Sequence, residues 1–434
     1  MNKLILFLII ILSFYSCSFN KSSKFWTPSK PILEENNTKN LRVDEKQEII
    51  KSELNTDFIL DITSSPKKFS FENNLTNNYA RLNFNSDLEN LSKFKFKKIN
   101  NFFQYEPNIS FENGNVIFFN NYGEIFKFNQ NLELLWSQNI YNKREQKQNP
   151  VLQIVNDGNH LIVADNLARY YALDIQTGEV LWSKINNAPF NSQIKIYKNN
   201  FYIVDFNNTL KSFSLKSGNE IWSAQSETSL VRSQKRLSIV ILDNVLFFNN
   251  SLGDITAVDI KQGEIIWQIP TQSSLIYENA FSLKSSDLVI DKKSLFISNN
   301  KNQLFSIDQK TGLVNWESKI NSNLSSIILD NFIITISNEG FLFVSEKNNG
   351  KILRSTDLFK SFNPKKRDKI KPSGFIIGNN TLYLTTNHGR LLLIDLRNGQ
   401  NLSIKKISKD ELSRPYVENQ KIYIAQDNSI IRID

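Results

Sequence analysis

From about residue 84 to the C-terminus, apolar and polar residues alternate in short runs that end in Asn, Gly or Asp. Typical runs are Phe201–Asp205 and Gly253–Asp259. A period of two, with many β-branched and aromatic residues, predicts strands, and the residues between the runs predict tight turns. No segment outside the N-terminal region shows a convincing helical period of 3.6. The pattern therefore predicts an all-β chain.

One phrase recurs along this region: an Asp, three residues, a Gly, three residues and a Trp. It is clearest in Leu173–Trp182 and Val258–Trp267, and two later copies, Lys347–Arg354 and Ile394–Gly399, keep the Gly but lose the Trp. The Trp positions are separated by 46, 40, 45 and 49 residues; they are Trp136, Trp182, Trp222, Trp267 and Trp316. Four strands repeated every ~40–50 residues are typical of a β-propeller blade.

The number of blades follows from the two ends of the repeat region. The phrases give seven units, and Ser413–Ile433 supply three further strands before the chain stops. Residues Leu91–Lys98 can provide the missing fourth strand and close the ring, which would remove open sheet edges. We therefore predict an eight-bladed β-propeller of four-stranded blades over residues 84–434.

The repeated residues have structural roles in this interpretation. Each Trp is expected to pack between adjacent sheets, where its large apolar area contributes most to stability. The Gly of the phrase is expected to adopt a positive φ in a hairpin. The equivalent acids are expected to accept hydrogen bonds from backbone N–H groups of their turns; they are Asp174, Asp259, Asp308 and Asp395.

The N-terminus predicts export. Lys3 and the nine apolar residues Leu4–Leu12 resemble a signal peptide, since the run is too short for a bilayer span. The single cysteine, Cys17, follows Ser16 directly, as in a bacterial lipoprotein cleavage site. We predict a signal peptide at 1–16, lipidation of Cys17 and a tether at 17–83 with a possible short helix over 43–62. The alternative is an ordinary secretory signal with an incidental cysteine.

The Asp-x-x-x-Gly-x-x-x-Trp phrase resembles the PQQ-type propeller repeat. Together with the lipoprotein signal and tether, the chain resembles the outer-membrane assembly lipoprotein family BamB from about residue 70 to 434. The resemblance implies a non-catalytic periplasmic scaffold, anchored in the outer membrane by its lipid. Its implied partners are the central barrel assembly protein and its accessory lipoproteins. An alternative mode, which the sequence does not separate from the first, is the pairing of an unfolded substrate strand with an exposed blade edge.

The family's partner-binding loop matches Ser229–Arg232, which implies that Val231 and Arg232 contact the partner. The following residue is Ser233, where the family often has Gly, and Gln234–Arg236 makes the flank more basic. The alternative is an ordinary solvated loop between blades.

Charge and candidate chemistry change this picture little. The formal net charge is +9, but the export signal argues against a nucleic-acid partner. The strongest basic clusters, residues 359–372 and 142–150, are either solvated loops or contacts with a partner or anionic lipid. His160 and His388 are the only histidines, and we expect no catalytic residue, metal site or cofactor. The alternative is a quinoprotein-like dehydrogenase or a propeller that binds a small molecule in its channel.

Overall fold

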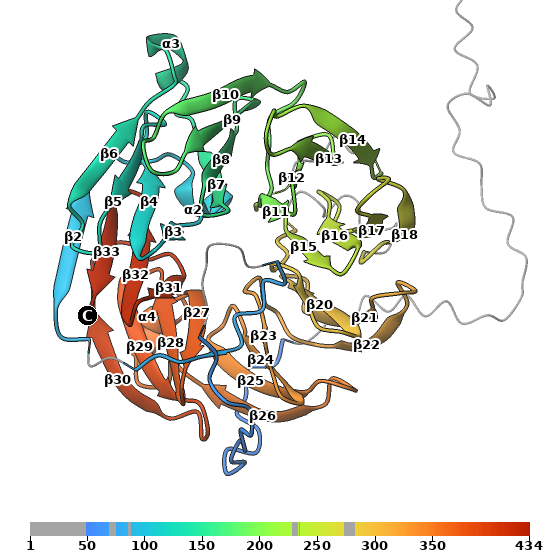
Figure 1. The fold of residues 1–434 in the computed structure, drawn as a ribbon. Coiled ribbons are helices and arrows are strands. Elements are labelled where there is room, and N and C mark those ends of the chain that lie inside the picture. Colours follow the sequence, from blue (N-terminus) through green and yellow to red (C-terminus); the bar gives the residue numbers. More distant parts are fainter. Residues whose placement is uncertain (1–48, 69–74, 86–87, 228–232, 234, 273–282) are drawn as a thin grey trace, which may run out of the picture. The chain divides into compact units, whose positions relative to one another are not determined.

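The computed structural model describes residues 49–68, 75–85, 88–227, 233, 235–272 and 283–434. Within these residues, eight separate sheets follow one another around a ring (Figure 1). In every blade the four strands of the repeat are antiparallel neighbours, ordered from the centre of the ring to its rim. The predicted eight-bladed propeller of four-stranded blades is confirmed.

The first four blades follow the order of the chain, and the hairpin to the outermost strand carries a register shift in each of them. The first blade contains β3 (Ser110–Glu112), β4 (Asn115–Phe119), β5 (Ile125–Phe128) and β6 (Leu134–Gln138), and the second contains β7 (Leu152–Asn156), β8 (His160–Asp165), β9 (Arg169–Asp174) and β10 (Val180–Ile185). The third contains β11 (Lys195–Tyr197), β12 (Asn200–Val204), β13 (Thr209–Ser214) and β14 (Glu220–Gln225), and the fourth contains β15 (Ile239–Leu242), β16 (Val245–Asn249), β17 (Ile255–Asp259) and β18 (Ile265–Ile269).

Blades five to seven repeat this order, and the eighth uses the last three strands of the chain. The fifth blade contains β19 (Val289–Ile290), β20 (Ser294–Asn299), β21 (Gln303–Asp308) and β22 (Val314–Ser318), and the sixth contains β23 (Ile327–Leu329), β24 (Phe332–Ile336), β25 (Phe341–Glu346) and β26 (Ile352–Asp357). The seventh contains β27 (Pro372–Gly378), β28 (Thr381–Thr386), β29 (Arg390–Asp395) and β30 (Asn401–Lys406), and the eighth contains β31 (Pro415–Glu418), β32 (Lys421–Gln426) and β33 (Ser429–Ile433).

The ring is closed by a strand from the beginning of the repeat region. β2 (Leu91–Lys95) pairs antiparallel with β33, from Leu91 opposite Ile433 to Lys95 opposite Ser429. The eighth blade therefore contains the two ends of the propeller, which lie side by side in Figure 1. This confirms the predicted closure and removes the open edges that an unclosed array would present.

Each Trp of the repeat joins its blade to the next. Trp136 Nε1 donates to the Ile175 carbonyl at 3.1 Å, and its ring lies against Gly178, where a Cβ would come within 2.7 Å of it. Four other Trp residues make the same two contacts, a hydrogen bond to a carbonyl and packing on a Gly. They are Trp182 (Leu215 carbonyl, Gly218), Trp222 (Ile260 carbonyl, Gly263), Trp267 (Gln309 carbonyl, Gly312) and Trp316 (Lys347 carbonyl, Gly350). The Gly of one blade thus provides the surface on which the Trp of the preceding blade packs.

Arg354 stands in the sixth blade where the first five blades have Trp, and its side chain is buried. Its Nη2 donates to the Leu396 carbonyl of the seventh blade at 3.0 Å, which is the acceptor position that Trp uses elsewhere. Its Nη1 donates to the carbonyls of Arg397 and, at 3.0 Å, of Phe58. Burial lowers the pKa of Arg354 to about 10. An arginine therefore replaces the Trp link and also binds the N-terminal segment.

Residues 49–68 pack on the sixth and seventh blades, whereas we expected a tether here. Leu54 exchanges two backbone hydrogen bonds of 3.0 Å with Ser355 on the outer edge of β26, and Leu60 is fully buried. The residues from 49 to 62 form no helix in the structure, and residues 43–48 lie outside the described part. The physical reason is the alternation of Phe58, Leu60 and Ile62, which gives an extended segment one apolar side that packs against the sheets.

Residues 75–82 cross the centre of the ring and contact several blades (Figure 1). The Leu75 carbonyl accepts from Ile241 N at 3.1 Å, and Asn77 Nδ2 donates to Gln193 Oε1 at 2.9 Å. Asn78 Oδ1 accepts from Ile328 N at 3.1 Å. The segment then ends in β1 (Arg81–Leu82), which adds a parallel fifth strand to β27. The compact structure therefore includes residues that precede the predicted boundary at 84.

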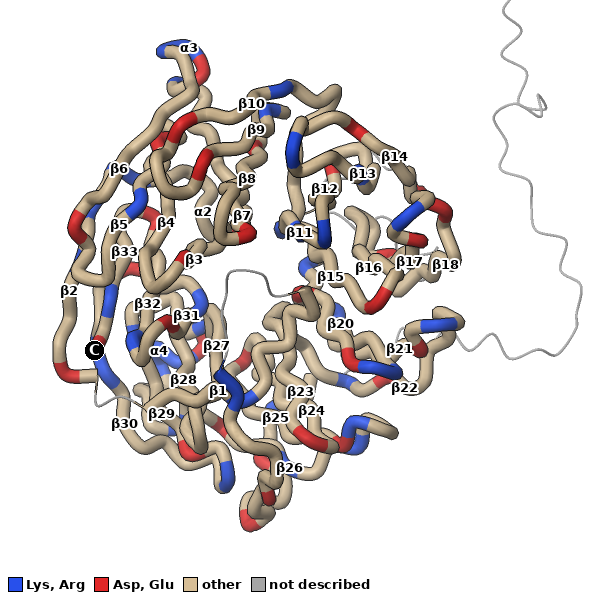
Figure 2. Tube along the Cα trace, viewed as in Figure 1, with Lys and Arg blue, Asp and Glu red and all other residues tan. Residues whose placement is uncertain are grey.

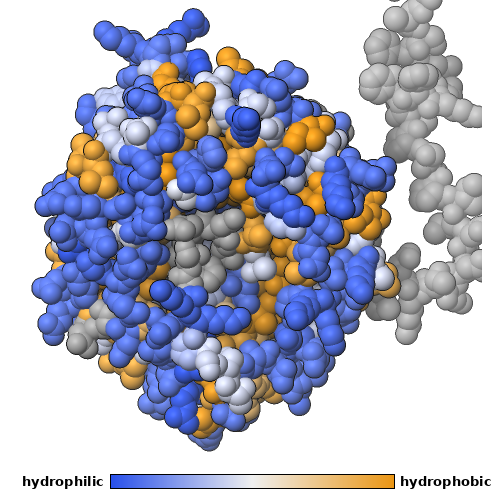
Figure 3. All heavy atoms as spheres, viewed as in Figure 1, coloured by the Kyte–Doolittle hydropathy of each residue, from blue (hydrophilic) through white to orange (hydrophobic). Residues whose placement is uncertain are grey.

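The surface is mixed in charge and mostly polar. Figure 2 shows basic and acidic residues interspersed around the whole ring, without a face of one sign. Figure 3 shows separate hydrophobic patches on a largely hydrophilic surface. Most of the exposed large apolar side chains lie on or beside the outermost strands, among them Leu134, Leu135, Leu181, Ile185, Ile221, Ile266, Val314 and Leu402.

A buried carboxyl between the first two blades gives a prediction on pH. Asp165 accepts from Leu167 N and Arg169 N, both at 2.8 Å, and from the Tyr141 hydroxyl. Burial raises its pKa from 3.8 to about 6. The folded protein therefore keeps this proton where the unfolded chain has lost it, so the stabilising contribution is complete below pH ~4 and is lost as the pH rises to ~6.

Asp165→Asn removes this titration. We expect the free energy of unfolding of the variant, relative to the wild type, to increase by up to about 3 kcal/mol between pH 4 and pH 7. Urea unfolding at several pH values measures the difference. An offset between the two proteins that does not change with pH would contradict the assignment.

Candidate docking site at the hub of the propeller

A funnel of about 600 Å³ opens at the face of the ring where the innermost strands begin. Its walls are residues that precede or begin β3, β15, β19, β23, β27 and β31, the turn residues Asn300, Asn338 and Asn387, and the short helix α2 (Phe102–Tyr105). Five basic and three acidic side chains line it: Lys235, Arg236, Lys284, Lys371 and Arg414, with Glu106, Asp287 and Glu411. The funnel thus brings together charged residues from five blades.

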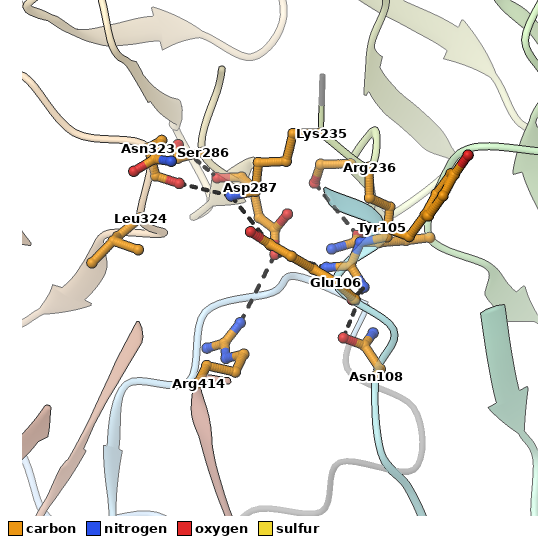
Figure 4. Close-up of polar contacts among 12 residues, drawn as sticks. Tyr105, Glu106, Asn108, Lys235, Arg236, Ser286, Asp287, Asn323, Leu324 and Arg414 are labelled. Atoms are coloured by element: carbon orange, nitrogen blue, oxygen red, sulfur yellow. Dashed lines mark hydrogen bonds and ion pairs between the residues drawn. The ribbon is translucent and has the colours of Figure 1, made fainter. Parts of the chain in front are cut away.

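Arg236 is the central link in the wall (Figure 4). Its side chain is 2% exposed, and its Nη1 donates to the Glu106 carbonyl and to Asn108 Oδ1, both at 2.8 Å. Its Nη2 lies 3.4 Å from Asp287 Oδ2. Because these partners belong to the first and fifth blades and Arg236 precedes the fourth, the guanidinium fixes three blades relative to one another.

Asp287 is the carboxylate shared by the surrounding cations. Its Oδ2 also lies 3.8 Å from Arg414 Nη1, on the connection to the eighth blade (Figure 4). Burial by itself would raise the pKa of Asp287, but the charges of Arg236, Lys235 and Arg414 outweigh burial and hold this pKa below its usual value. Asp287 is therefore ionised at neutral pH and balances part of the positive charge of the hub.

Two further groups of the hub have pKa values near neutrality. Burial, together with the charges of Arg236 and Arg414, lowers the pKa of Lys195 to about 7 against the attraction of Asp287. Burial and the charges of Glu106 and Asp427 raise the pKa of Glu411 to about 7. The net charge of the hub therefore becomes more positive as the pH falls through 7.

The predicted partner-binding residues Val231 and Arg232 lie outside the described residues, and so does Cys17. The nearest described part of their loop enters the funnel wall. Lys235 Nζ donates to the Asn323 carbonyl at 2.7 Å and lies 3.4 Å from Glu106 Oε2. The loop that we expected to bind a partner is thus fixed at its C-terminal side by contacts to the first, fifth and sixth blades.

Both basic loops make ion pairs with neighbouring segments. In residues 359–372, which contain α4 (Pro364–Arg367), Arg367 pairs with Asp357 and Lys360 pairs with Glu53 at 3.0 Å. Lys371 of the same loop lines the funnel. In residues 142–150, α3 (Lys143–Gln146) is capped by Asn142, and its Glu145 pairs with Arg169.

The remaining candidates for chemistry have local partners. Asp174 Oδ1 accepts from Gln176 N at 2.9 Å and Thr177 N at 2.8 Å, and Asp259 and Asp308 accept from two backbone N–H groups of their turns in the same way. Asp395 Oδ1 accepts from Arg397 N at 2.8 Å. These contacts confirm the predicted role of the turn acids. His160 Nδ1 lies 3.1 Å from Asp157 Oδ2, and His388 Nδ1 lies 2.8 Å from Asn387 Oδ1.

No pattern in the sequence predicts a role for Arg236, Asp287 or Arg414. Each stands just before the innermost strand of a different blade, far from the others along the chain, so nothing in the local pattern marks them as neighbours. A partial signal was the basic flank at Lys235–Arg236, directly after the predicted partner-binding residues.

Comparisons with solved structures support the fold. BamB from Moraxella catarrhalis is similar with a TM-score of 0.63 and 16% identity, over 80% of this chain and 100% of that one. The computationally designed protein Ika8 has a TM-score of 0.59 and 13% identity, over 82% and 99% of the two chains. Quinohemoprotein alcohol dehydrogenase from Comamonas testosteroni has a TM-score of 0.59 and 9% identity, over 82% and 78%. At such identities the similarity is one of fold.

A comparison with protein families is more specific. No curated protein matches the sequence. The family model described as outer membrane protein assembly factor BamB matches residues 121–356, which is more than half of the chain. These residues run from the first to the sixth blade and include the repeated Trp links. The chain therefore belongs to the BamB family of outer membrane protein assembly factors, with PQQ-like β-propeller repeats.

Proposed function

We propose that this protein is a non-catalytic scaffold of the machinery that assembles β-barrel proteins in the outer membrane. It binds the central barrel assembly protein through the loops around the funnel. The observation that carries the proposal is membership of the BamB family, combined with a predicted partner-binding loop whose described end is fixed in the funnel wall. A closed ring suits a scaffold because its blades present many loops at fixed spacing.

The hub favours docking on this face. Arg236 and Lys235 fix the loop that carries Val231 and Arg232 to three other blades, which reduces the conformational entropy lost when a partner binds. The excess of basic side chains in the funnel also favours a partner with acidic groups, because complementary charges accelerate encounter and select orientation.

Substrate strands are proposed to bind in a second mode, at the outer edges of the blades. The N-terminal segment supports this mode, since Leu54 already pairs with Ser355 on the edge of β26 through two backbone hydrogen bonds. Other outermost strands carry exposed apolar residues, such as Leu181, Ile185 and Ile266. An extended apolar strand added to such an edge would satisfy backbone groups and cover these side chains.

The scaffold is proposed to be held at the periplasmic face of the outer membrane by a lipid on Cys17. Within the described residues, no helix is long and apolar enough to cross a bilayer. The apolar run Leu4–Leu12 followed by Cys17 supports acylation after removal of the signal peptide. The residues between Cys17 and the N-terminal segment that begins at residue 49 would then connect the lipid anchor to the propeller.

Recovery of partners from detergent-solubilised envelopes tests this function. We expect the tagged full chain to retain a large outer-membrane β-barrel protein. The double variant Val231→Asp, Arg232→Glu should reduce the recovered amount of that protein at least about tenfold, because an apolar contact and a positive charge are lost together. Lys261→Glu, on an exposed turn between β17 and β18, is the control and should leave recovery unchanged. Cys17→Ala should move the protein to the soluble periplasmic fraction.

Two outcomes would reject the docking proposal. One is that the wild-type chain retains no outer-membrane barrel protein. The other is that the loop variant and Lys261→Glu behave alike. Retention of Cys17→Ala in the membrane fraction would reject the lipid anchor but not the docking.

A further inference from the structure

The side chain of Arg414 is held at the hub by rings and charge, not by hydrogen bonds. Its Cζ lies 4.0 Å from the ring centroid of Tyr79 and 5.7 Å from that of Tyr416. Its closest acid is Asp287, at 3.8 Å, and that carboxylate is also shared with Arg236. Among the described residues, none accepts a hydrogen bond from this guanidinium, although the group carries five N–H donors.

Such an arrangement is unfavourable unless the donors find acceptors. The Arg414 side chain is 15% exposed and its Nε is buried without a partner in the described part of the chain. A buried donor that lacks an acceptor costs about 1–3 kcal/mol. A guanidinium that is stacked on aromatic rings is also fixed in orientation, so its N–H fork is preorganised for a planar or tetrahedral oxyanion.

The charges around Arg414 favour an anion as the ligand. Asp287 is surrounded by Arg236, Lys235, Arg414 and Lys195, whose charges all act on its pKa. At the mouth, the exposed Lys284 and Lys371 make no side-chain hydrogen bond or ion pair with any described residue. The funnel wall therefore carries an excess of basic side chains, and the charges of Lys284 and Lys371 are not paired with a described acid.

The size and walls of the funnel suit a small molecule. Its volume of about 600 Å³ lies in the range of typical small-molecule sites. Apolar side chains line it beside the cations, including Phe103, Leu324 and Phe375. Tyr79, on the segment that crosses the hub, lies against the Arg414 guanidinium that lines the funnel. A ligand with an anionic group and an apolar part would match both surfaces.

We propose that the funnel binds a small organic anion, whose carboxylate or phosphate group is held by Arg414 and attracted by Lys371 and Lys284 at the mouth. The proposed site uses residues other than Val231 and Arg232, and the proposal does not require that the protein be a scaffold. It adds a ligand to the hub face, where occupancy would change the charge that a docking partner meets.

Calorimetric titration of the purified mature chain tests the site. The probes are phenyl phosphate, benzoate and inorganic phosphate, with benzamide as the uncharged analogue. We expect saturable binding of one equivalent of at least one of the two aromatic anions, with a dissociation constant of roughly 1 mM or lower, and none of benzamide. The tighter of the two aromatic anions identifies phosphate or carboxylate as the preferred group, and inorganic phosphate shows whether the apolar part contributes.

Matched variants locate the binding. Arg414→Gln should weaken the anion at least about tenfold and Lys371→Ser about threefold, whereas Lys261→Ser should have no effect. Lys371 is exposed, so its variant is expected to fold normally, and this keeps the test decisive if Arg414→Gln is unstable. The proposal is overturned if neither aromatic anion binds saturably below about 10 mM, or if Lys371→Ser and a folded Arg414→Gln bind like the wild type.

Discussion

Replacing Gly263 by alanine is expected to lower the free energy of unfolding by about 3 kcal/mol. Gly263 has a φ of +76°, a conformation that costs an L-residue about 1–2 kcal/mol. A Cβ at this position would also lie 2.6 Å from the ring of Trp222. Since that ring is fixed by its hydrogen bond to the Ile260 carbonyl, it cannot move away without breaking the link between the third and fourth blades.

Gly158→Ala is the matched control, because it separates backbone strain from the contact with Trp. Gly158 has a φ of +91°, but no atom lies within 4 Å of the position that its Cβ would take. This variant should therefore lose only about 1–2 kcal/mol. Urea unfolding, followed by Trp fluorescence and circular dichroism, measures both variants. Equal losses in the two proteins would show that the Trp contact does not hold neighbouring blades together.

Asp287→Asn is expected to destabilise the protein by about 3–5 kcal/mol, because it leaves the buried charges of Arg236 and Arg414 without their shared counter-charge. The substitution keeps the size of the side chain and one acceptor oxygen, so the loss reports on charge. The effect should be largest at neutral pH and below, where Lys195, with a pKa of about 7, is also protonated.

Asp291→Asn provides the control for a carboxylate in a less enclosed place. Asp291 pairs with Lys347 at 3.1 Å, but both side chains remain about a quarter exposed. Its substitution should cost about 1 kcal/mol or less, as expected for a solvated ion pair. If Asp287→Asn were as mild as Asp291→Asn in urea unfolding, the hub would not depend on the balance of charge described above.

The blades could be predicted from the sequence because the signal is local and repeated. A period of two identifies each strand, and the phrase that ends in Trp182 or Trp267 marks the same hairpin in successive blades. Closure was also predictable, since three strands at the C-terminus require a fourth and Leu91–Lys98 precede the first repeat. These inferences use residues that are neighbours in the sequence, or that repeat at a regular spacing.

The hub and the N-terminal segment could not be predicted in this way. Arg236, Asp287 and Arg414 become neighbours only because the ring brings the connections of different blades to one point. The sequence shows Arg354 in place of the repeated Trp, but the hydrogen bond from Arg354 to the Phe58 carbonyl depends on a segment almost 300 residues earlier in the chain. Residues 49–68 are polar enough to resemble a tether, and their apolar side is short, so burial against the sheets decides their structure.

Site-specific photocrosslinking in intact envelopes tests most directly the claim that the hub face docks onto the barrel assembly machinery. A photoreactive residue at Ser233, beside the predicted contacts, should yield a crosslinked outer-membrane barrel protein, while the same residue at Lys261 should not. Crosslinks to that protein from Lys261 alone, or none from Ser233 to any protein, would contradict the account.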